Sequence, residues 1–322
     1  MGAVRAITYT RYGTPDVLAL SEVDRPFPGD HDLLIRVVAA SVNRSDWETL
    51  VGRPFYARVG GLFRPKTPTP GTDVAGVVEA IGTQVTAFSP GEEVFGDIMY
   101  HGGRAFADYA CVKDSAVLVP KPESLSFVEA STLPQAGLIA LQGTRDRIAP
   151  GDRVLINGAG GGAGILAIQL AKAAGAEVTG VDNGHKQAFM RSMGADRVID
   201  YTAEDYTGSG KYDLILDFVC ERSMFAIRRA LAPGGRYSIV GGRTRALLSA
   251  ATLGRLLSTG GRRLGVLMVR PNKEDLTRIA DMVTRGELRT HIDRVFPLEE
   301  TADALRHLGE GLTLGKVVIT TG

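Results

Sequence analysis

The sequence contains only two cysteines, Cys111 and Cys220, and they lie far apart in the chain. Both stand in apolar segments typical of strands, where a buried free thiol is the expected state. Two such cysteines exclude a disulfide framework and a cysteine-rich zinc lobe.

The chain also lacks an excess of charge of either sign. The 37 Lys and Arg residues are balanced by 36 Asp and Glu residues, which leaves a formal net charge of +1. No large positive field is available to hold nucleic acid or an anionic membrane surface. We therefore expect a small-molecule partner, with no nucleic acid and no membrane.

Long hydrophobic runs are the third absence. The first residues lack the apolar segment of a secretory signal, and no later run approaches the roughly 20 residues needed to cross a bilayer. These features predict a cytoplasmic protein. The hydrophobic fraction of 44% and the charged fraction of 23% are ordinary for a globular chain, and 322 residues favour two domains.

The segment 153–182 combines an apolar strand, a glycine-rich turn, an amphipathic helix, a second apolar strand and a final Asp182. This order predicts a dinucleotide-binding βαβ unit. Gly161 would let backbone N–H groups approach a pyrophosphate, and Gly164 would let helix and strand pack closely. The alternative is a βαβ unit whose glycines serve packing alone. The residues expected to bind the coenzyme here are Ala159, Gly160, Gly161, Gly162, Ala163 and Gly164.

Residues 1–122 read as short strands separated by glycine and proline clusters, which predicts a mostly antiparallel β domain. The expected strands are 4–8, 33–42, 73–81, 93–95, 106–112 and 117–119. Between them, residues 52–71 hold four prolines and four glycines, a composition typical of a long irregular loop.

Residues 123–270 alternate strands with helices, which predicts a doubly wound parallel sheet of about six strands, an α/β architecture. The expected strands are 154–157, 178–181, 197–199, 214–218, 236–240 and 264–269. The tail, residues 271–322, has mixed helix and strand character and is expected to complete the first domain.

Six segments in this order carry a family resemblance: ASVNRSDW (40–47), PGTDVAGVVEAIG (70–82), GDRVLINGAGGGAG (151–164), GADRVIDY (194–201), LAPGGRYSIVGG (231–242) and GKVVIT (315–320). The chain resembles the medium-chain dehydrogenase/reductase superfamily, in its zinc-free quinone oxidoreductase-like branch. The resemblance implies a GroES-like catalytic domain, a Rossmann cofactor domain and, as usual in the family, a homodimer.

The same resemblance bears on metal chemistry, because alcohol dehydrogenases of this superfamily hold a catalytic zinc with Cys and His. This sequence has Asn43 and Thr72 at two of those positions and Gln135 near the third. An amide and a hydroxyl cannot replace that ligand set, although Asp73 is nearby. We therefore expect no metal site.

Without zinc, nothing would stabilise the alkoxide that must form before an alcohol gives up hydride. Reduction of a quinone or an α,β-unsaturated carbonyl compound places negative charge on an oxygen that hydrogen-bond donors can hold. We expect a zinc-independent oxidoreductase that transfers hydride from NAD(P)H to such a compound. The alternatives are an NAD(P)-dependent alcohol dehydrogenase of the same fold, and a cofactor-binding structural or RNA-binding protein without turnover.

Two residues are candidates for catalysis. Asn43 could donate its amide to a substrate carbonyl or hold the edge of the nicotinamide, or it could be a turn residue that bonds its own backbone. Tyr56, in the long loop, could donate a proton to the enolate, or it could be an exposed loop tyrosine. Lys316 could reach the nicotinamide region, or it could be a solvated lysine at the start of a strand.

Coenzyme choice depends on Asp182, because a carboxylate beside the ribose favours NAD(H) and repels the 2′-phosphate of NADP(H). Lys186 could pair with that phosphate, or it could be a helix-surface lysine. Members of the branch more often use NADPH and carry no acid here. We expect NAD(H) to be slightly favoured. Further expected contacts, whose alternative is sheet core or turn, are Tyr201, Val219, Val240, Gly241 and Val269.

Overall fold

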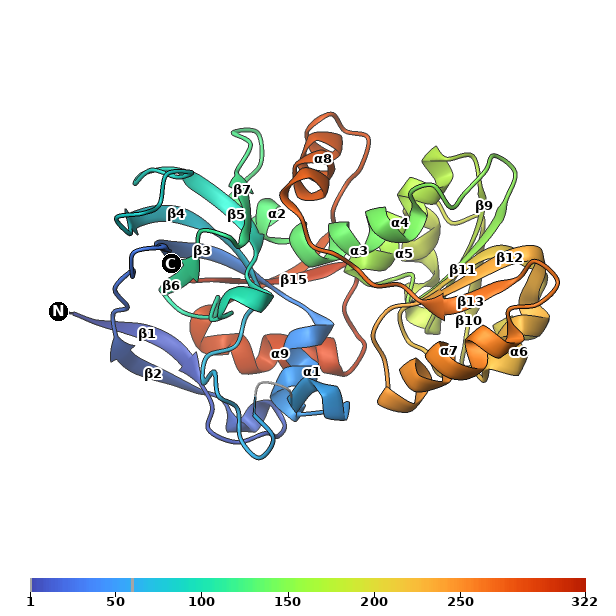
Figure 1. Cartoon of the computed structure of the whole chain (residues 1–322), viewed down its shortest axis with the longest axis horizontal. Helices are drawn as coiled ribbons and strands as arrows, with labels where there is room; N and C mark the ends of the chain where they lie inside the picture. Colours follow the sequence, from blue (N-terminus) through green and yellow to red (C-terminus); the bar gives the residue numbers. More distant parts are fainter. Residues whose placement is uncertain (1, 59–60) are drawn as a thin grey trace. The chain divides into compact units, whose positions relative to one another are not determined.

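The computed structural model describes residues 2–58 and 61–322 (Figure 1). It divides into two compact units, one formed by Met1–Gln135 with Pro271–Gly322 and the other by Ala136–Arg270. The first unit extends to Gln135 instead of ending at residue 122, because α2 (Phe127–Ser131) packs against its strands β3 and β4.

The first unit is built on a seven-stranded sheet with the order β14-β15-β3-β4-β5-β7, and β6 also pairs with β3. The strands are β3 (Asp32–Val42), β4 (Asp73–Ile81), β5 (Glu93–Asp97), β6 (Tyr109–Lys113), β7 (Val117–Pro120), β14 (Ile292–Pro297) and β15 (Lys316–Thr320). The tail thus completes this sheet, with β15 antiparallel to β3. A separate hairpin joins β1 (Ala3–Thr8) to β2 (Ala19–Asp24). The mostly antiparallel sheet predicted for this part is confirmed.

Four helices of the first unit accompany the sheet: α1 (Arg44–Val51), α2, α8 (Lys273–Thr284) and α9 (Thr301–Gly309). A capping box opens α2, since Ser126 and Glu129 each accept the other's backbone N–H. Helix α1 follows β3 after a single residue, Asn43, and ends at Gly52, whose φ is 62°. This helix was not predicted, because its charged and polar residues show no clear apolar period.

The second unit contains a six-stranded parallel sheet with the order β10-β9-β8-β11-β12-β13. Its strands are β8 (Arg153–Asn157), β9 (Glu177–Asp182), β10 (Arg197–Asp200), β11 (Tyr212–Asp217), β12 (Leu231–Ile239) and β13 (Arg263–Val266). Figure 1 shows α4 (Gly162–Ala173) and α5 (Gln187–Ser192) on one face, and α6 (Met224–Ala230) and α7 (Thr244–Leu257) on the other. The predicted doubly wound sheet is confirmed. Helix α3 (Pro134–Thr144) leads into this unit.

Two details differ from the sequence prediction. Helix α7 was missed because it carries leucines on its exposed side as well as its packed side; Leu248 and Leu256 are both exposed. Strand β13 ends at Val266, so Val269 lies beyond the strand and not at its end. Among the described residues, no helix is both long enough and apolar enough to span a bilayer.

Candidate functional site

The glycine-rich turn lies at the carboxyl end of β8, and α4 starts directly after it. Gly161 is the N-cap of α4, with an extended backbone (φ −87°, ψ 175°), and no side chain caps the helix. A Cβ on Gly164 would lie 2.3 Å from the Gly158 carbonyl oxygen and 2.6 Å from Ala159 backbone atoms, so only glycine fits there. A Cβ on Gly161 would meet nothing closer than 3.5 Å. Open backbone at Gly161 and uncapped helix N–H groups fit the pyrophosphate of a dinucleotide.

Asp182 and Lys186 form a buried pair beside this turn. One oxygen of Asp182 accepts the Gly160 N–H at 3.0 Å, and the other accepts the Asn183 N–H at 2.9 Å. The Lys186 ammonium nitrogen lies 3.3 Å from the same carboxylate. Asp182 is 9% exposed and Lys186 is 6% exposed, so the interpretation of Lys186 as a helix-surface lysine is wrong. The acid and the base expected to govern coenzyme choice therefore contact one another.

The other predicted coenzyme contacts follow neighbouring strands. Tyr201 comes after β10, Val219 after β11, and Val240 with Gly241 after β12. Tyr201 and Val219 are partly exposed, at 43% and 42%, and are not sheet core. Because carboxyl ends of parallel strands share one edge, these residues lie on the same edge of the sheet as the glycine turn.

A buried carboxylate that the sequence reasoning missed organises the backbone after β11. Asp217 accepts hydrogen bonds from Asn157 Nδ2 at 2.8 Å, from Tyr237 Oη at 3.1 Å, and from the backbone N–H groups of Val219 and Cys220 at 3.1 and 2.8 Å. Burial raises the pKa of Asp217, and these donors oppose that effect. The chain turns here with Cys220 at a φ of 67°. Asp217 thereby holds the segment that carries Val219.

A second polar cluster lies wholly within the first unit and centres on the hydroxyl of Thr72. The Thr72 oxygen accepts from Asn43 Nδ2 at 3.3 Å and from Gln135 Nε2 at 2.9 Å. Gln135 is oriented by Ser45, whose hydroxyl donates to Gln135 Oε1 at 2.9 Å. Two side-chain amides thus direct N–H groups to one point, and Thr72 and Gln135 are partly exposed. The cluster joins Asn43 and Thr72, which the family resemblance places at two zinc-ligand positions, with Gln135, which lies near the third.

Charged groups lie buried beneath these amides. The Lys316 ammonium nitrogen is 2.6 Å from Asn43 Oδ1 and 3.5 Å from an Asp73 oxygen, and Ser41 Oγ donates to the same Asp73 oxygen at 3.0 Å. Lys316 is 4% exposed, so its interpretation as a solvated lysine is wrong. Burial lowers the pKa of Lys316, and Asp73 opposes this shift.

Two further carboxyl groups belong to this buried layer. Burial raises the pKa of Asp46 to about 7. The hydrogen bond that Asp46 accepts from the Asn43 backbone N–H, at 2.8 Å, acts in the opposite direction and lowers the pKa. Burial, with the negative charge of Asp73, raises the pKa of Asp97 to about 7. Asp97 gave no signal in the sequence. Among the described residues, no group of three or more His, Cys, Asp or Glu could hold a metal ion.

Tyr56 lies in a short helical turn, Phe55–Arg58, and its hydroxyl donates to Glu48 Oε2 of α1 at 3.2 Å. Burial raises the pKa of Glu48. The structure thus places the Tyr56 hydroxyl against a carboxyl group, while Asn43 bonds Thr72 and Lys316. Tyr56 is half-buried, which argues against a fully exposed loop tyrosine.

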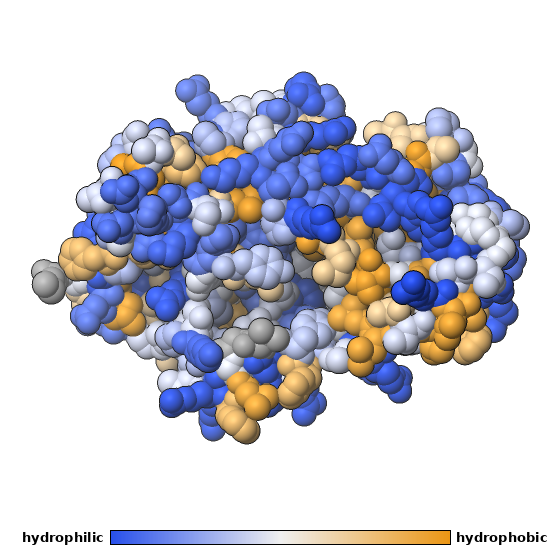
Figure 2. Space-filling view, viewed as in Figure 1, coloured by the Kyte–Doolittle hydropathy of each residue, from blue (hydrophilic) through white to orange (hydrophobic). Residues whose placement is uncertain are grey.

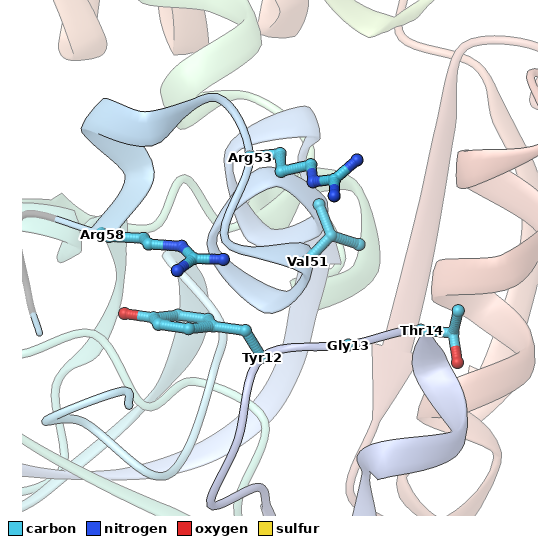
Figure 3. Close-up of a pocket in the computed structure, with 6 residues that line it drawn as sticks. All are labelled: Tyr12, Gly13, Thr14, Val51, Arg53 and Arg58. Atoms are coloured by element: carbon cyan, nitrogen blue, oxygen red, sulfur yellow. The ribbon is translucent and has the colours of Figure 1, made fainter. Parts of the chain in front are cut away.

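A pocket of about 330 Å³ opens beside this turn (Figure 3). The guanidinium of Arg58 lies over the Tyr12 ring, 4.9 Å from its centre, and Arg58 Nε donates to the Gly52 carbonyl oxygen at 2.9 Å. Figure 3 shows the Arg53 side chain directed away from Arg58. The pocket is lined by Tyr12, Gly13, Thr14, Val51, Arg53 and Arg58.

Comparison with known proteins identifies the family. Residues 29–123 match the alcohol dehydrogenase GroES-like domain, and residues 193–319 match the zinc-binding dehydrogenase family. The chain belongs to the medium-chain dehydrogenase/reductase superfamily, in its quinone oxidoreductase-like branch, as the sequence motifs predicted.

Three relatives illustrate the match. A chloroplastic quinone oxidoreductase, QR1, of Triphysaria versicolor is 32% identical over 98% of both chains. A 2-methylene-furan-3-one reductase of Solanum lycopersicum is 33% identical over 98% of this chain and 79% of its own length. The solved quinone oxidoreductase of Coxiella burnetii is 30% identical, covers 100% of both chains and superposes with a TM-score of 0.90.

Proposed function

We propose that this protein is an oxidoreductase that reduces quinones or α,β-unsaturated carbonyl compounds with a nicotinamide coenzyme. The observation that carries the proposal is the pair of amides, Asn43 and Gln135, that direct N–H groups toward Thr72. Such donors suit an oxygen that gains negative charge when the substrate is reduced. Two relatives are named quinone oxidoreductases, and a third is named for a ketone conjugated with an exocyclic double bond.

When bound, a reduced nicotinamide supplies hydride to the electron-poor carbon of the substrate. The residues of the chain then have two tasks. Asn43 holds the reacting oxygen by donating its side-chain N–H. Tyr56 supplies a proton to the enolate from its hydroxyl, which Glu48 orients as a hydrogen-bond acceptor at 3.2 Å, and solvent then returns a proton to Tyr56.

We propose that the reaction needs no metal. Asn43 and Thr72, at two of the family's zinc-ligand positions, and Gln135, near the third, supply no thiolate, imidazole or carboxylate. The Lys316 ammonium already bonds the oxygen of Asn43, so a cation at that oxygen would meet another positive charge. An alcohol dehydrogenase mechanism has no comparable support, because amide donors stabilise an alkoxide far less than zinc does.

For the coenzyme, we propose a modest preference for NAD(H). Asp182 sits at the end of β9, where its carboxylate would accept hydrogen bonds from the ribose and repel a 2′-phosphate. Lys186 partly neutralises that carboxylate, so we expect the preference to be small. NADP(H) is the alternative.

We further propose a homodimer and keep a cytoplasmic location as a prediction of the sequence. Strand β13 is at one edge of the parallel sheet, and an unpaired edge can accept a strand from a second copy. Exposed apolar side chains accompany it: Leu256 is 74% exposed and Met268 is 73% exposed. Figure 2 shows hydrophobic residues gathered around α7.

One experiment tests the proposed function. Purified protein is titrated with NADH and NADPH by fluorescence, and oxidation of the tighter coenzyme is followed with a panel of quinones and enones, with and without chelator. We expect turnover that chelator leaves unchanged. Tight coenzyme binding without turnover across the panel would instead favour a structural or RNA-binding role, and turnover of alcohols lost with chelator would favour an alcohol dehydrogenase.

A further inference from the structure

Lys316 is a buried cation whose donors all have partners. Residue Val317 of β15 pairs with Val42 of β3, so Lys316 comes level with Asn43, the residue between β3 and α1. Its ammonium has acceptors at Asn43 Oδ1 (2.6 Å), the Val42 carbonyl oxygen (3.3 Å) and an Asp73 oxygen (3.5 Å). An ammonium has three N–H donors, so these three acceptors satisfy it.

This contact decides which way the Asn43 amide faces. Lysine can only donate, so the Asn43 atom beside it must be the carbonyl oxygen. The Asn43 NH₂ group then faces Thr72, where it donates at 3.3 Å. The reversed amide would place NH₂ against an ammonium and leave that buried cation without its shortest hydrogen bond.

The contact also changes the strength of Asn43 as a donor. A charged donor on the amide oxygen draws electron density from the nitrogen, and hydrogen bonds linked in this way strengthen each other in a low-dielectric environment. The Asn43 N–H groups therefore become better donors to an oxygen that carries negative charge.

Stability alone is a poor explanation for this lysine. Burying an ammonium and a carboxylate costs several kcal/mol in desolvation, and replacing a buried ion pair by apolar residues of similar size is often neutral or stabilising. Apolar residues in place of both Lys316 and Asp73 would avoid that cost, whereas an apolar residue at 316 alone would leave the buried Asp73 carboxylate unpaired. The retained charge therefore calls for a role beyond packing.

We propose that Lys316 is a positioning residue for the reaction: through its bond to Asn43 Oδ1, it sets the orientation of the Asn43 amide and strengthens its N–H for the substrate oxygen. The inference rests on the proposed function, in which Asn43 contacts that oxygen. Lys316 itself contacts no substrate and acts only through Asn43.

The test compares Lys316→Met with a matched control, Lys121→Met. Lys121 is a second buried lysine of the same unit, with its own carboxylate partner Glu93 at 2.9 Å, and it has no contact with Asn43. Removing one donor to a developing oxyanion costs about 10²–10³ in kcat. Because Lys316 acts through such a donor, we expect Lys316→Met to lower kcat about 10- to 100-fold, with coenzyme affinity unchanged, and Lys121→Met to leave kcat unchanged.

A spectroscopic measurement reports on Asn43 directly. The chain has only four asparagines, Asn43, Asn157, Asn183 and Asn272, so labelling with ¹⁵N-asparagine yields four side-chain amide signals. Asn43→Ser identifies the Asn43 signal by its loss. We expect Lys316→Met to shift that signal upfield and Lys121→Met to leave it in place.

The outcomes separate the two proposals. Folded Lys316→Met protein with wild-type kcat, or with an unshifted Asn43 signal, would overturn the positioning role. If Lys316→Met does not fold by circular dichroism, the charge-neutral variant Lys316→Met/Asp73→Asn replaces it in both measurements. If the wild-type protein reduces no quinone or enone, the proposed function fails, and the Asn43 signal still decides whether Lys316 holds the amide.

Discussion

The paired substitutions Gly164→Ala and Gly161→Ala separate the structural glycine from the binding glycine of the nucleotide turn. In Gly164→Ala, the added Cβ would lie 2.3 Å from the Gly158 oxygen and 2.6 Å from Ala159, all backbone atoms that cannot rotate away. Overpacking of this kind costs about 1–3 kcal/mol. Alanine regains about 1 kcal/mol of helix propensity at most. Because the overlapping atoms belong to the backbone, the cost lies at the upper end of this range and exceeds the gain, and we expect a net loss of about 2 kcal/mol of unfolding free energy.

Gly161→Ala should behave in the opposite way. Its backbone is extended, at φ −87°, and the new Cβ meets nothing closer than 3.5 Å, so any residue can adopt this geometry. Alanine is a poorer N-cap than glycine, and the exchange costs up to about 1 kcal/mol, which is less than the cost expected for Gly164→Ala. The methyl group would, however, occupy the space through which a pyrophosphate reaches the backbone. We expect coenzyme affinity to fall at least about tenfold, which corresponds to about 1.4 kcal/mol.

The assay is urea unfolding followed by far-UV circular dichroism, together with coenzyme titration by fluorescence. The only tryptophan, Trp47, lies in the first unit, so its emission reports whether that unit is unaffected by changes in the second. Two units need not unfold in one step, and the two signals are therefore fitted separately. The reasoning is refuted if Gly164→Ala unfolds at the wild-type urea concentration, or if Gly161→Ala loses as much stability as Gly164→Ala.

Three further predictions concern charge and assembly. The pKa of Asp46 is about 7 in the folded protein, against an ordinary value of 3.8. The folded state therefore binds this proton more tightly than the unfolded state, and the unfolding free energy falls as pH rises from about 4 to about 7. The loss is at most about 4 kcal/mol. The unfolding free energy measured with urea should therefore be lower at pH 8 than at pH 5. In Asp46→Asn the difference between the two pH values should be smaller than in the wild type, and a difference as large as that of the wild type would contradict this prediction. Asp182→Ser should shift the ratio of NADH to NADPH affinity about five- to thirtyfold toward NADPH, which corresponds to about 1–2 kcal/mol. The reason is that Lys186 can then pair with the 2′-phosphate. An unchanged ratio in fluorescence titration would count against Asp182 as the residue that selects the coenzyme. By light scattering, Leu256→Glu should be a monomer where the wild type is a dimer. The control Phe27→Glu changes an exposed phenylalanine of the other unit and should remain a dimer. A dimer that persists in Leu256→Glu would argue for another interface.

Local patterns were enough to predict most elements of both units. The βαβ unit is determined by residues adjacent in sequence, since glycine spacing and apolar period specify turn, helix and strand together. The capping box at Ser126 is equally local. Helix α1 and helix α7 were missed for different reasons: α1 is short and largely polar, and α7 has several exposed leucines that blur its apolar face.

The candidate sites likewise combine features set by local sequence with features set by tertiary packing. The sequence by itself determined the fold class, the glycine turn, the acid that follows β9 and the replacement of zinc ligands by Asn43, Thr72 and Gln135, because each of these is a residue type at a fixed place in a motif. Only the tertiary structure decided that Lys186 is paired with Asp182, and that Lys316, 273 residues beyond Asn43, bonds its amide. Burial and long-range pairing set the charge state and orientation of a side chain, and no local pattern of residues encodes them.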